Sequence, residues 1–116
     1  MMNRQLGQAG EDLAVKYLQG KCYSIVERNF RTAYGEIDII CEVSGGLVFV
    51  EVKTRRSHKF GLPQEAITPA KIRHLKRAAY QYLDSYSRPF KFIRFDVVAI
   101  TIQSDQNRIE HIESAF

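Results

Sequence analysis

Residues 35–56 form the stretch that most constrains how this 116-residue chain can fold. Two segments rich in Ile, Val and Phe lie on either side of Ser44-Gly45-Gly46. Apolar runs separated by a short glycine turn predict two β-strands joined as a hairpin. Because apolar residues dominate both predicted strands, we expect a sheet that is covered on both faces, as in an α/β layered fold.

Three charged residues interrupt these apolar strands: Asp38, Glu51 and Lys53. Side chains two residues apart on a strand share a face, so Glu51 and Lys53 are expected to point the same way, about 6.6 Å apart at ~3.3 Å per residue. Charged groups on buried strands need an opposite charge or a metal ion. The predicted faces are Glu36, Asp38 and Ile40 opposite Ile37, Ile39 and Cys41 on the first strand, and Phe49, Glu51 and Lys53 opposite Val48, Val50 and Val52 on the second.

The whole chain is expected to form one domain, residues 1–116, with the element order α-β-β-β-α-β-β. Asn3 is a suitable N-cap for the first helix, and Thr68-Pro69 is typical of a helix start. Besides the hairpin, the predicted helices are 4–18 and 68–86, and the predicted strands are 22–30, 92–102 and 108–113.

The first predicted helix has glycines in its interior, Gly7 and Gly10. Each lowers helix stability by roughly 1 kcal/mol relative to Ala, which makes sense where another backbone or a substrate approaches closely. Glu11 lies one turn after Gly7, on that open side; alone it also fits an exposed glutamate near a helix N-terminus.

Composition restricts the class of protein. No apolar run approaches the roughly 20 residues of a membrane span, and the N-terminus lacks a signal-peptide core, so we expect a cytoplasmic protein without membrane contact. The two cysteines, Cys22 and Cys41, fall in predicted strands without metal-ligand spacing. Reduced, buried thiols are the expected state.

Basic residues are concentrated in one part of the chain. Residues 53–94 contain eleven Lys and Arg against two acidic residues, whereas the rest of the chain has more acidic than basic residues. A basic half beside an acidic cluster favours a polyanion held next to a cation site, although a solvated surface would show the same charge. The candidate nucleic-acid-binding residues are Arg31, Arg55, Arg56, Lys71, Arg73, Lys76 and Arg77.

Two further residues allow alternative interpretations. His74 lies among the basic residues of the second predicted helix, and an ordinary surface or boundary histidine is the alternative interpretation. Asp96 lies on an otherwise apolar predicted strand, and either joins the acidic site or is a hydrogen-bonded structural aspartate.

Asp38, Glu51 and Lys53 match the needs of phosphodiester hydrolysis. Mg²⁺ binds one or two carboxylates together with waters and substrate phosphate, so Asp38 and Glu51 are candidate ligands, with Mn²⁺ as a substitute. The Lys53 ammonium can orient or help deprotonate the attacking water and offset charge on the phosphate. A structural ion pair of Lys53 with either carboxylate is the alternative.

The order Asp38, then Glu51-Val52-Lys53, resembles the Asp…Glu-x-Lys signature of the restriction-endonuclease-like nucleases. Four blocks in order also resemble the YraN-like family of small bacterial proteins, an endonuclease-like group similar to archaeal Holliday-junction resolvases. These blocks are Gly7-Gln8-Ala9-Gly10-Glu11, Arg28-Asn29-Phe30-Arg31, Gly35-Glu36-Ile37-Asp38-Ile39-Ile40 and Val48-Phe49-Val50-Glu51-Val52-Lys53-Thr54-Arg55.

The resemblance implies a restriction-endonuclease-like α/β domain with a central mixed sheet flanked by helices. It also implies that Glu11, Asp38, Glu51 and Lys53 occupy the acidic and lysine positions of a catalytic metal site. The resulting prediction is a metal-dependent DNA endonuclease acting on branched or damaged DNA in repair or recombination. A non-enzymatic DNA-binding module with the same fold and an RNA-processing nuclease are the alternatives.

Cleavage of two strands usually involves a two-fold dimer, so we also expect a homodimer.

Overall fold

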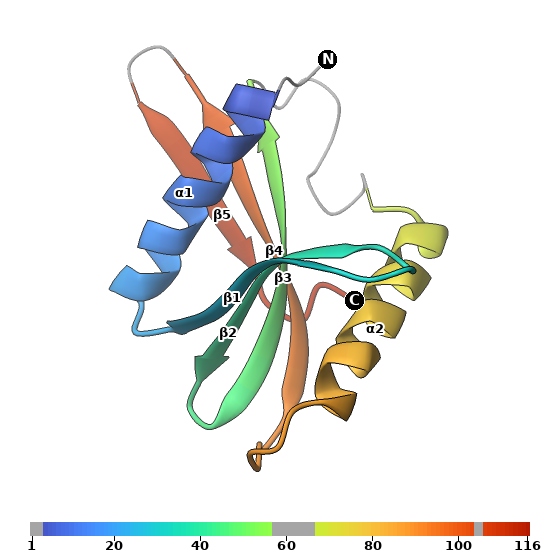
Figure 1. The fold of residues 1–116 in the computed structure, drawn as a ribbon. Coiled ribbons are helices and arrows are strands. Elements are labelled where there is room, and N and C mark those ends of the chain that lie inside the picture. The colour runs from blue at the N-terminus through green and yellow to red at the C-terminus, as the bar shows by residue number, and fades with distance from the viewer. Residues whose placement is uncertain (1–3, 57–66, 104–105) are drawn as a thin grey trace.

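The computed structural model describes residues 4–56, 67–103 and 106–116, and its elements follow the predicted order α-β-β-β-α-β-β (Figure 1). These described residues form an α/β fold with one five-stranded mixed sheet and two helices. The elements are α1 (Arg4–Gly20), β1 (Ser24–Arg31), β2 (Glu36–Val43), β3 (Gly46–Arg55), α2 (Pro69–Asp84), β4 (Ile93–Ile102) and β5 (Asn107–Ile112).

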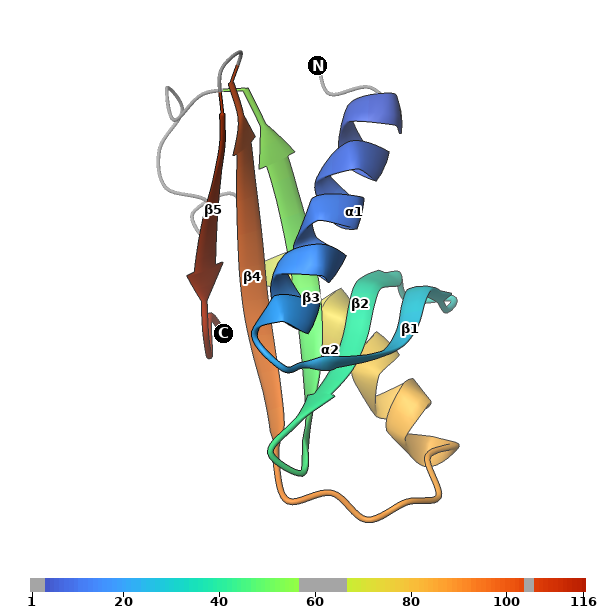
Figure 2. The ribbon, with the colours of Figure 1, turned by 90° about the vertical axis from the view of Figure 1, so that its left-hand side faces the viewer.

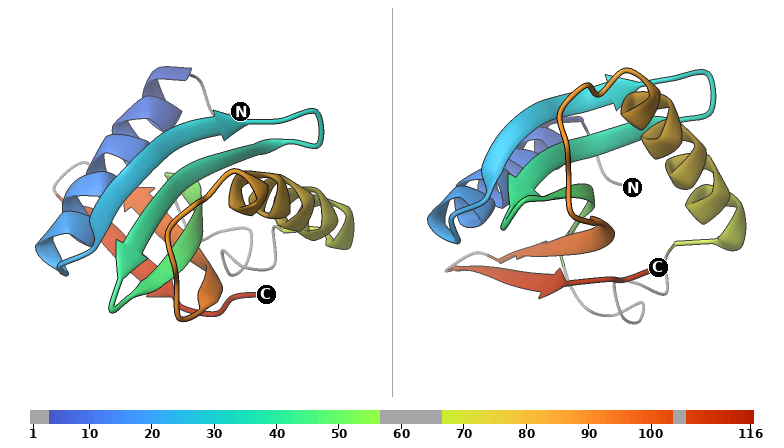
Figure 3. Two further views of the ribbon diagram at one scale, coloured as in Figure 1. Left: turned by 60° about the horizontal axis from the view of Figure 1, so that its bottom comes forward. Right: turned by 90° about the horizontal axis from the view of Figure 1, so that it is seen from below.

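The strands lie in the sheet in their order along the chain, β1-β2-β3-β4-β5. Among the five described strands, β3 and β4 are the only parallel pair and are joined by the connection that contains α2; the other neighbours are antiparallel. Figure 2 shows α1 in front of the sheet and α2 behind it, and Figure 3 shows the strands between the two helices. Both faces of the central strands are therefore covered, as the apolar composition of the hairpin predicts.

The sheet forks where β2 separates from β3. Their pairing ends at Ile39 and Val50, while β2 continues beside β1 as far as Glu36 and β3 continues beside β4 as far as Arg55. Backbone groups just beyond the last pair need other partners, because a buried N–H without an acceptor is destabilising. Asp38, which precedes Ile39, and Glu51, which follows Val50, are the first residues beyond the last pair.

The α1 face of the sheet holds one of two hydrophobic clusters. Ala14 and Leu18 of α1 pack on residues of β2, β3 and β4. Gly10 lies so close to β3 that a Cβ atom added there would be 1.9 Å from Thr54 Oγ1. A close approach at Gly10 is therefore present, but the group that approaches is the side chain of Thr54 on β3 rather than a backbone or a substrate.

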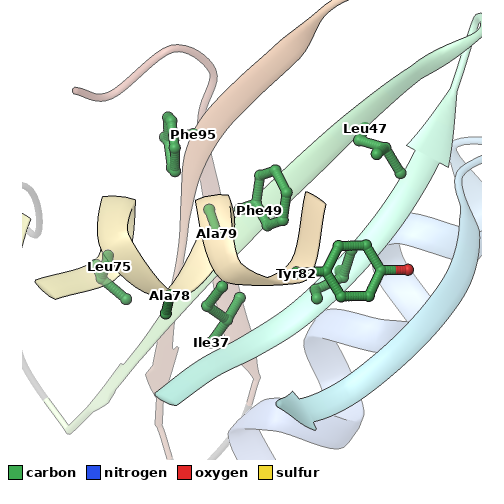
Figure 4. Packing of buried hydrophobic residues seen from close by; sticks show 9 residues of the cluster. Ile37, Leu47, Phe49, Leu75, Ala78, Ala79, Tyr82 and Phe95 are labelled. Atoms are coloured by element: carbon green, nitrogen blue, oxygen red, sulfur yellow. The ribbon is translucent and has the colours of Figure 1, made fainter. Parts of the chain in front are cut away.

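The α2 face holds the second cluster, drawn in Figure 4. Leu75, Ala78, Ala79 and Tyr82 of α2 are buried against the sheet, with Phe49 among the strand residues that they cover. Thr68 caps the helix, since its hydroxyl accepts the backbone N–H of Lys71 at 3.1 Å. This cap fixes the first turn of α2, where a side chain described below reaches the fork.

Three local expectations differ from the structure. Ile37 packs in the same cluster as Ile40, not with Ile39 and Cys41, because regular alternation stops at the fork. Cys22 is exposed and precedes β1, with φ at +69°, whereas Cys41 is buried in β2; both are free thiols. The second helix ends at Asp84, two residues before the predicted end, and Ser85 caps it.

Neither of the helices that the structure describes is long and apolar enough to cross a membrane.

Candidate active site

The fork brings Asp38 and Glu51 together. The backbone N–H of Val52 donates a 2.8 Å hydrogen bond to Asp38 Oδ2, so the carboxyl group occupies the place of a backbone acceptor that β2 no longer provides. Glu51 lies on the α2 face of β3 with Phe49, as alternation predicts, and its side chain is only 5% exposed. Two carboxyl groups from neighbouring strands thus lie side by side at a largely buried position.

This arrangement opposes ionisation of Asp38. Burial, and next the negative charge of Glu51, raise the pKa of Asp38 to about 8, with the Val52 N–H acting in the opposite direction. Near neutral pH the metal-free protein therefore keeps Asp38 largely protonated. A cation bound between the two groups would remove that repulsion and favour the carboxylate form.

Two lysines face the same oxygen of Glu51. Lys53 Nζ lies 3.8 Å from Glu51 Oε2, on the side of β3 that alternation predicts. Lys71 Nζ, from the first turn of α2, lies closer, at 2.7 Å. Burial alone would lower the pKa of Lys71, but its hydrogen bond to Glu51 and the charge of that group raise it overall. Lys71 is therefore an ammonium ion in contact with the acidic pair.

Glu11 lies near the fork but has its own partners. Its Oε1 accepts hydrogen bonds from Arg28 Nη2 at 3.0 Å and from Asn29 Nδ2 at 3.0 Å. Arg28 also binds Asp12 at 2.7 Å, which fixes α1 against β1. The charge of Glu11 makes only a minor contribution to the raised pKa of Asp38. Glu11 is thus a neighbour of the pair, positioned by Arg28.

The donor set suits a small hard cation rather than a soft one. Within residues 4–56, 67–103 and 106–116, no three His, Cys, Asp or Glu side chains are grouped to hold a metal ion. Two carboxyl groups, Asp38 and Glu51, are what the fork offers. Mg²⁺ keeps several waters and needs only one or two carboxylates from the protein, so the pair fits such an ion.

The predicted nucleic-acid-binding residues do not form one uniform surface. Lys71 contacts Glu51, and Arg31 pairs with Glu36 at 3.1 Å while remaining largely exposed. Arg56 is exposed just after β3, and Arg55 is half-buried at the end of that strand.

The basic residues of α2 divide between two sides of the helix. Arg73 and Arg77 are exposed, and the Arg77 guanidinium lies 5.4 Å from the centre of the Tyr34 ring. Lys76 Nζ lies on the other side, 5.7 Å from the centre of the Phe95 ring. His74 is an exposed residue beside Gly35, where the β1–β2 connection reaches α2 (Figure 1).

Asp96 does not join the fork. It lies fully buried on β4 and accepts hydrogen bonds from Arg94 Nε at 2.8 Å and from the Ser114 backbone at 3.1 Å. Its Oδ2 also contacts His111 Nε2 at 2.7 Å. Burial alone would raise the pKa of Asp96, but the hydrogen bonds from His111 and Arg94 lower it overall. The sequence left two alternatives for Asp96, and the structure shows the second of them, a hydrogen-bonded structural aspartate.

Sequence reasoning did not find the contact of Lys71 with Glu51 or the pairing of Glu11 with Arg28. The Thr68-Pro69 cap places Lys71 in the first turn of a helix, which is the only local signal for its position. Arg28 belongs to a sequence block that the family resemblance singled out, without a partner assigned to it.

Comparisons with known proteins point to one family. The model of the family described as "Uncharacterised protein family UPF0102" matches residues 10–100, a range that contains Glu11, Asp38, Glu51 and Lys53. A UPF0102 protein of Syntrophomonas wolfei is 56% identical over 115 residues, which cover 99% of this chain and all of that protein. A relative in Geobacter sulfurreducens is 50% identical, covering 98% of this chain and 90% of the relative. One in Rhodococcus opacus is 47% identical and covers 98% of both chains.

Proposed function

The chain belongs to the UPF0102 family, the YraN-like group that its four sequence blocks resemble, and we propose that it is a metal-dependent DNA endonuclease. The observation that carries the proposal is the pair formed by the buried Glu51 and the half-buried Asp38, with Lys53 beside it, in the fork between β2 and β3. Placing a buried and a half-buried carboxyl group side by side lowers the stability of a fold, so the presence of this pair favours a functional role. Phosphodiester hydrolysis in branched or damaged DNA is the function that this group of residues fits best.

Each residue of the site has a defined role in the proposal. Asp38 and Glu51 would hold Mg²⁺ or Mn²⁺ through their carboxylate oxygens. When bound, the ion supplies Lewis-acid activation of the phosphate and lowers the pKa of a coordinated water. Lys53 Nζ lies on the same side of β3 as Glu51, where its ammonium can orient the attacking water and offset negative charge on the phosphate oxygens.

Exposed arginines near the site supply the affinity for DNA in this proposal. Arg73 and Arg77 on α2 and Arg56 after β3 are exposed residues. Guanidinium groups bind phosphate oxygens in a salt-dependent way and without base selectivity. They account for binding to the backbone of DNA, and the fork accounts for the reaction.

A DNA-binding module without catalytic activity is the second candidate. The observation in its favour is that basic partners already neutralise the acidic residues. Lys71 contacts Glu51 at 2.7 Å and Arg28 contacts Glu11 at 3.0 Å, as in structural ion pairs. This candidate predicts salt-dependent DNA binding with no cleavage under any metal condition.

Cleavage of labelled DNA distinguishes the two candidates. The purified protein is incubated with four-way junction, flap, nicked, linear duplex and single-stranded DNA, and with an RNA hairpin, in Mg²⁺, Mn²⁺ or EDTA. The endonuclease predicts cleavage that depends on the metal and favours one DNA shape. Binding without cleavage on every substrate would support the DNA-binding module, and cleavage confined to RNA would identify an RNA-processing nuclease.

A further inference from the structure

We infer that Lys71 is an internal counter-cation of the site. Its ammonium neutralises Glu51 in the metal-free protein and moves from Glu51 to the DNA backbone when a divalent cation binds. This inference rests on the proposed function, because it assumes that Asp38 and Glu51 hold the metal ion. It adds a mechanism by which metal binding and DNA binding strengthen each other.

The contact with Lys71 occupies one of the two Glu51 oxygens that could bind a metal ion. Lys71 Nζ lies 2.7 Å from Glu51 Oε2, a distance typical of a charge-assisted hydrogen bond. The second ammonium, on Lys53, lies 3.8 Å from the same oxygen. The positive charge of the two ammonium groups opposes the approach of a divalent cation, so withdrawal of one lysine would strengthen metal binding by Glu51.

Lys71 is the lysine that can withdraw. Its side chain is 44% exposed, against 28% for that of Lys53 and 5% for that of Glu51. The Thr68 cap holds the backbone of Lys71 in place, so the movement needs only rotation of a flexible four-carbon side chain. Lys53 is attached to a central strand, and its longer contact with Glu51 leaves more room for a bound ion.

The released ammonium has a suitable new partner. Lys71 lies in the first turn of α2, where the helix dipole already favours an anion. The exposed Arg73 lies in the same part of the helix. A phosphate of DNA at this position would attract Lys71 away from Glu51. By thermodynamic linkage, each ligand then increases the affinity for the other.

Metal affinity in the absence of DNA tests the inference without reference to activity. Mg²⁺ and Mn²⁺ binding are measured by titration calorimetry for wild type, Lys71→Ala, Lys71→Arg and Lys76→Ala. Loss of the competing ammonium in Lys71→Ala is expected to tighten binding by roughly fivefold to tenfold, equivalent to about 1 kcal/mol. Lys71→Arg keeps a cation on Glu51 and should not bind metal more tightly. Lys76→Ala removes a charge from the same helix without contact to Glu51, and should change affinity little.

DNA binding in EDTA provides the reciprocal measurement. Glu51→Gln releases Lys71, so this variant should bind DNA more tightly than wild type, and the gain should disappear in the Glu51→Gln, Lys71→Ala double variant. If Lys71→Ala binds metal no more tightly than wild type while Glu51→Gln abolishes metal binding, the inference is wrong and the proposed function stands. If wild type binds neither metal, both are wrong.

Discussion

The backbone N–H of Val52 and Oδ2 of Asp38 form a 2.8 Å hydrogen bond just beyond the last paired residues of β2 and β3. A side chain thus completes the hydrogen bonding of a backbone position where the sheet forks. The same bond holds the Asp38 carboxyl beside Glu51, in a place where burial and a like charge oppose its ionisation. The local architecture of the sheet therefore creates the electrostatic properties of the site.

The first prediction concerns the stability of the metal-free protein. The pKa of Asp38 is about 8 in the folded state, above its value of 3.8 in the unfolded chain, so the folded state retains this proton over the range between them. The resulting stabilisation is complete below the unfolded value and is lost as the pH rises toward the folded value. Between about pH 5.5 and about pH 8.5, wild type should lose roughly 3 kcal/mol more stability than Asp38→Asn. Urea unfolding in EDTA checks this, and equal losses in the two proteins would contradict it.

The second prediction tests the approach of α1 to β3. Gly10→Ala places a methyl group against Thr54, at a distance that neither backbone can accept without moving. We expect a loss of about 1–3 kcal/mol in the free energy of unfolding. Gly20→Ala is the matched control, because a Cβ atom there meets nothing within 4 Å. Comparable losses in both variants would argue against a steric cause.

The third prediction separates Glu11 from the acidic pair. Because Arg28 and Asn29 hold its carboxylate, Glu11 should act on the site through its charge and position rather than as a metal ligand. Glu11→Gln should lower the cleavage rate by roughly tenfold or less, since an indirect charge contributes on the order of 1 kcal/mol. Its metal affinity should be close to that of wild type. Abolished metal binding in Glu11→Gln would show that Glu11 is a ligand.

The fourth prediction distinguishes a structural carboxylate from those of the site. Asp96→Asn leaves Arg94 and His111 without their buried anion, so it should lower stability by about 3 kcal/mol. Cleavage measured well below the melting temperature should be unaffected, because Asp96 lies on the α1 side of the sheet, away from Glu51 and Lys71. If Asp96→Asn had the stability of wild type but no longer cleaved DNA, Asp96 would belong to the active site and not to the structural carboxylates.

The sequence predicts those parts of the fold and site that depend on local periodicity. Alternation along β3 places Glu51 and Lys53 on one side, and Thr68-Pro69 marks the start of α2. The contact between Lys71 and Glu51 is not predictable in this way, because it joins residues 20 positions apart through packing of α2 on the sheet.

The fork itself also cannot be predicted from local sequence patterns. Alternation fails at Ile37 because β2 pairs with β3 only from Ile39 onward, and no residue type there signals the change of direction. Asp96 shows the same limit. Its isolation from the site follows from which face of β4 it occupies and from partners on β5 and the C-terminal segment. Pairing between distant segments decides both outcomes.

The measurement that tests the central claim most directly compares the cleavage rates of wild type, Glu51→Gln and Glu42→Gln on the preferred DNA substrate in Mg²⁺. Glu42 lies on β2 with Asp38, where it accepts a 2.8 Å hydrogen bond from the Tyr86 hydroxyl, so its variant controls for loss of a carboxylate outside the fork. We predict that Glu51→Gln loses cleavage by a factor of about 1,000 or more, in keeping with loss of a metal ligand, while Glu42→Gln cleaves like wild type. Cleavage by Glu51→Gln at the wild-type rate would contradict the assignment of the active site to Asp38 and Glu51.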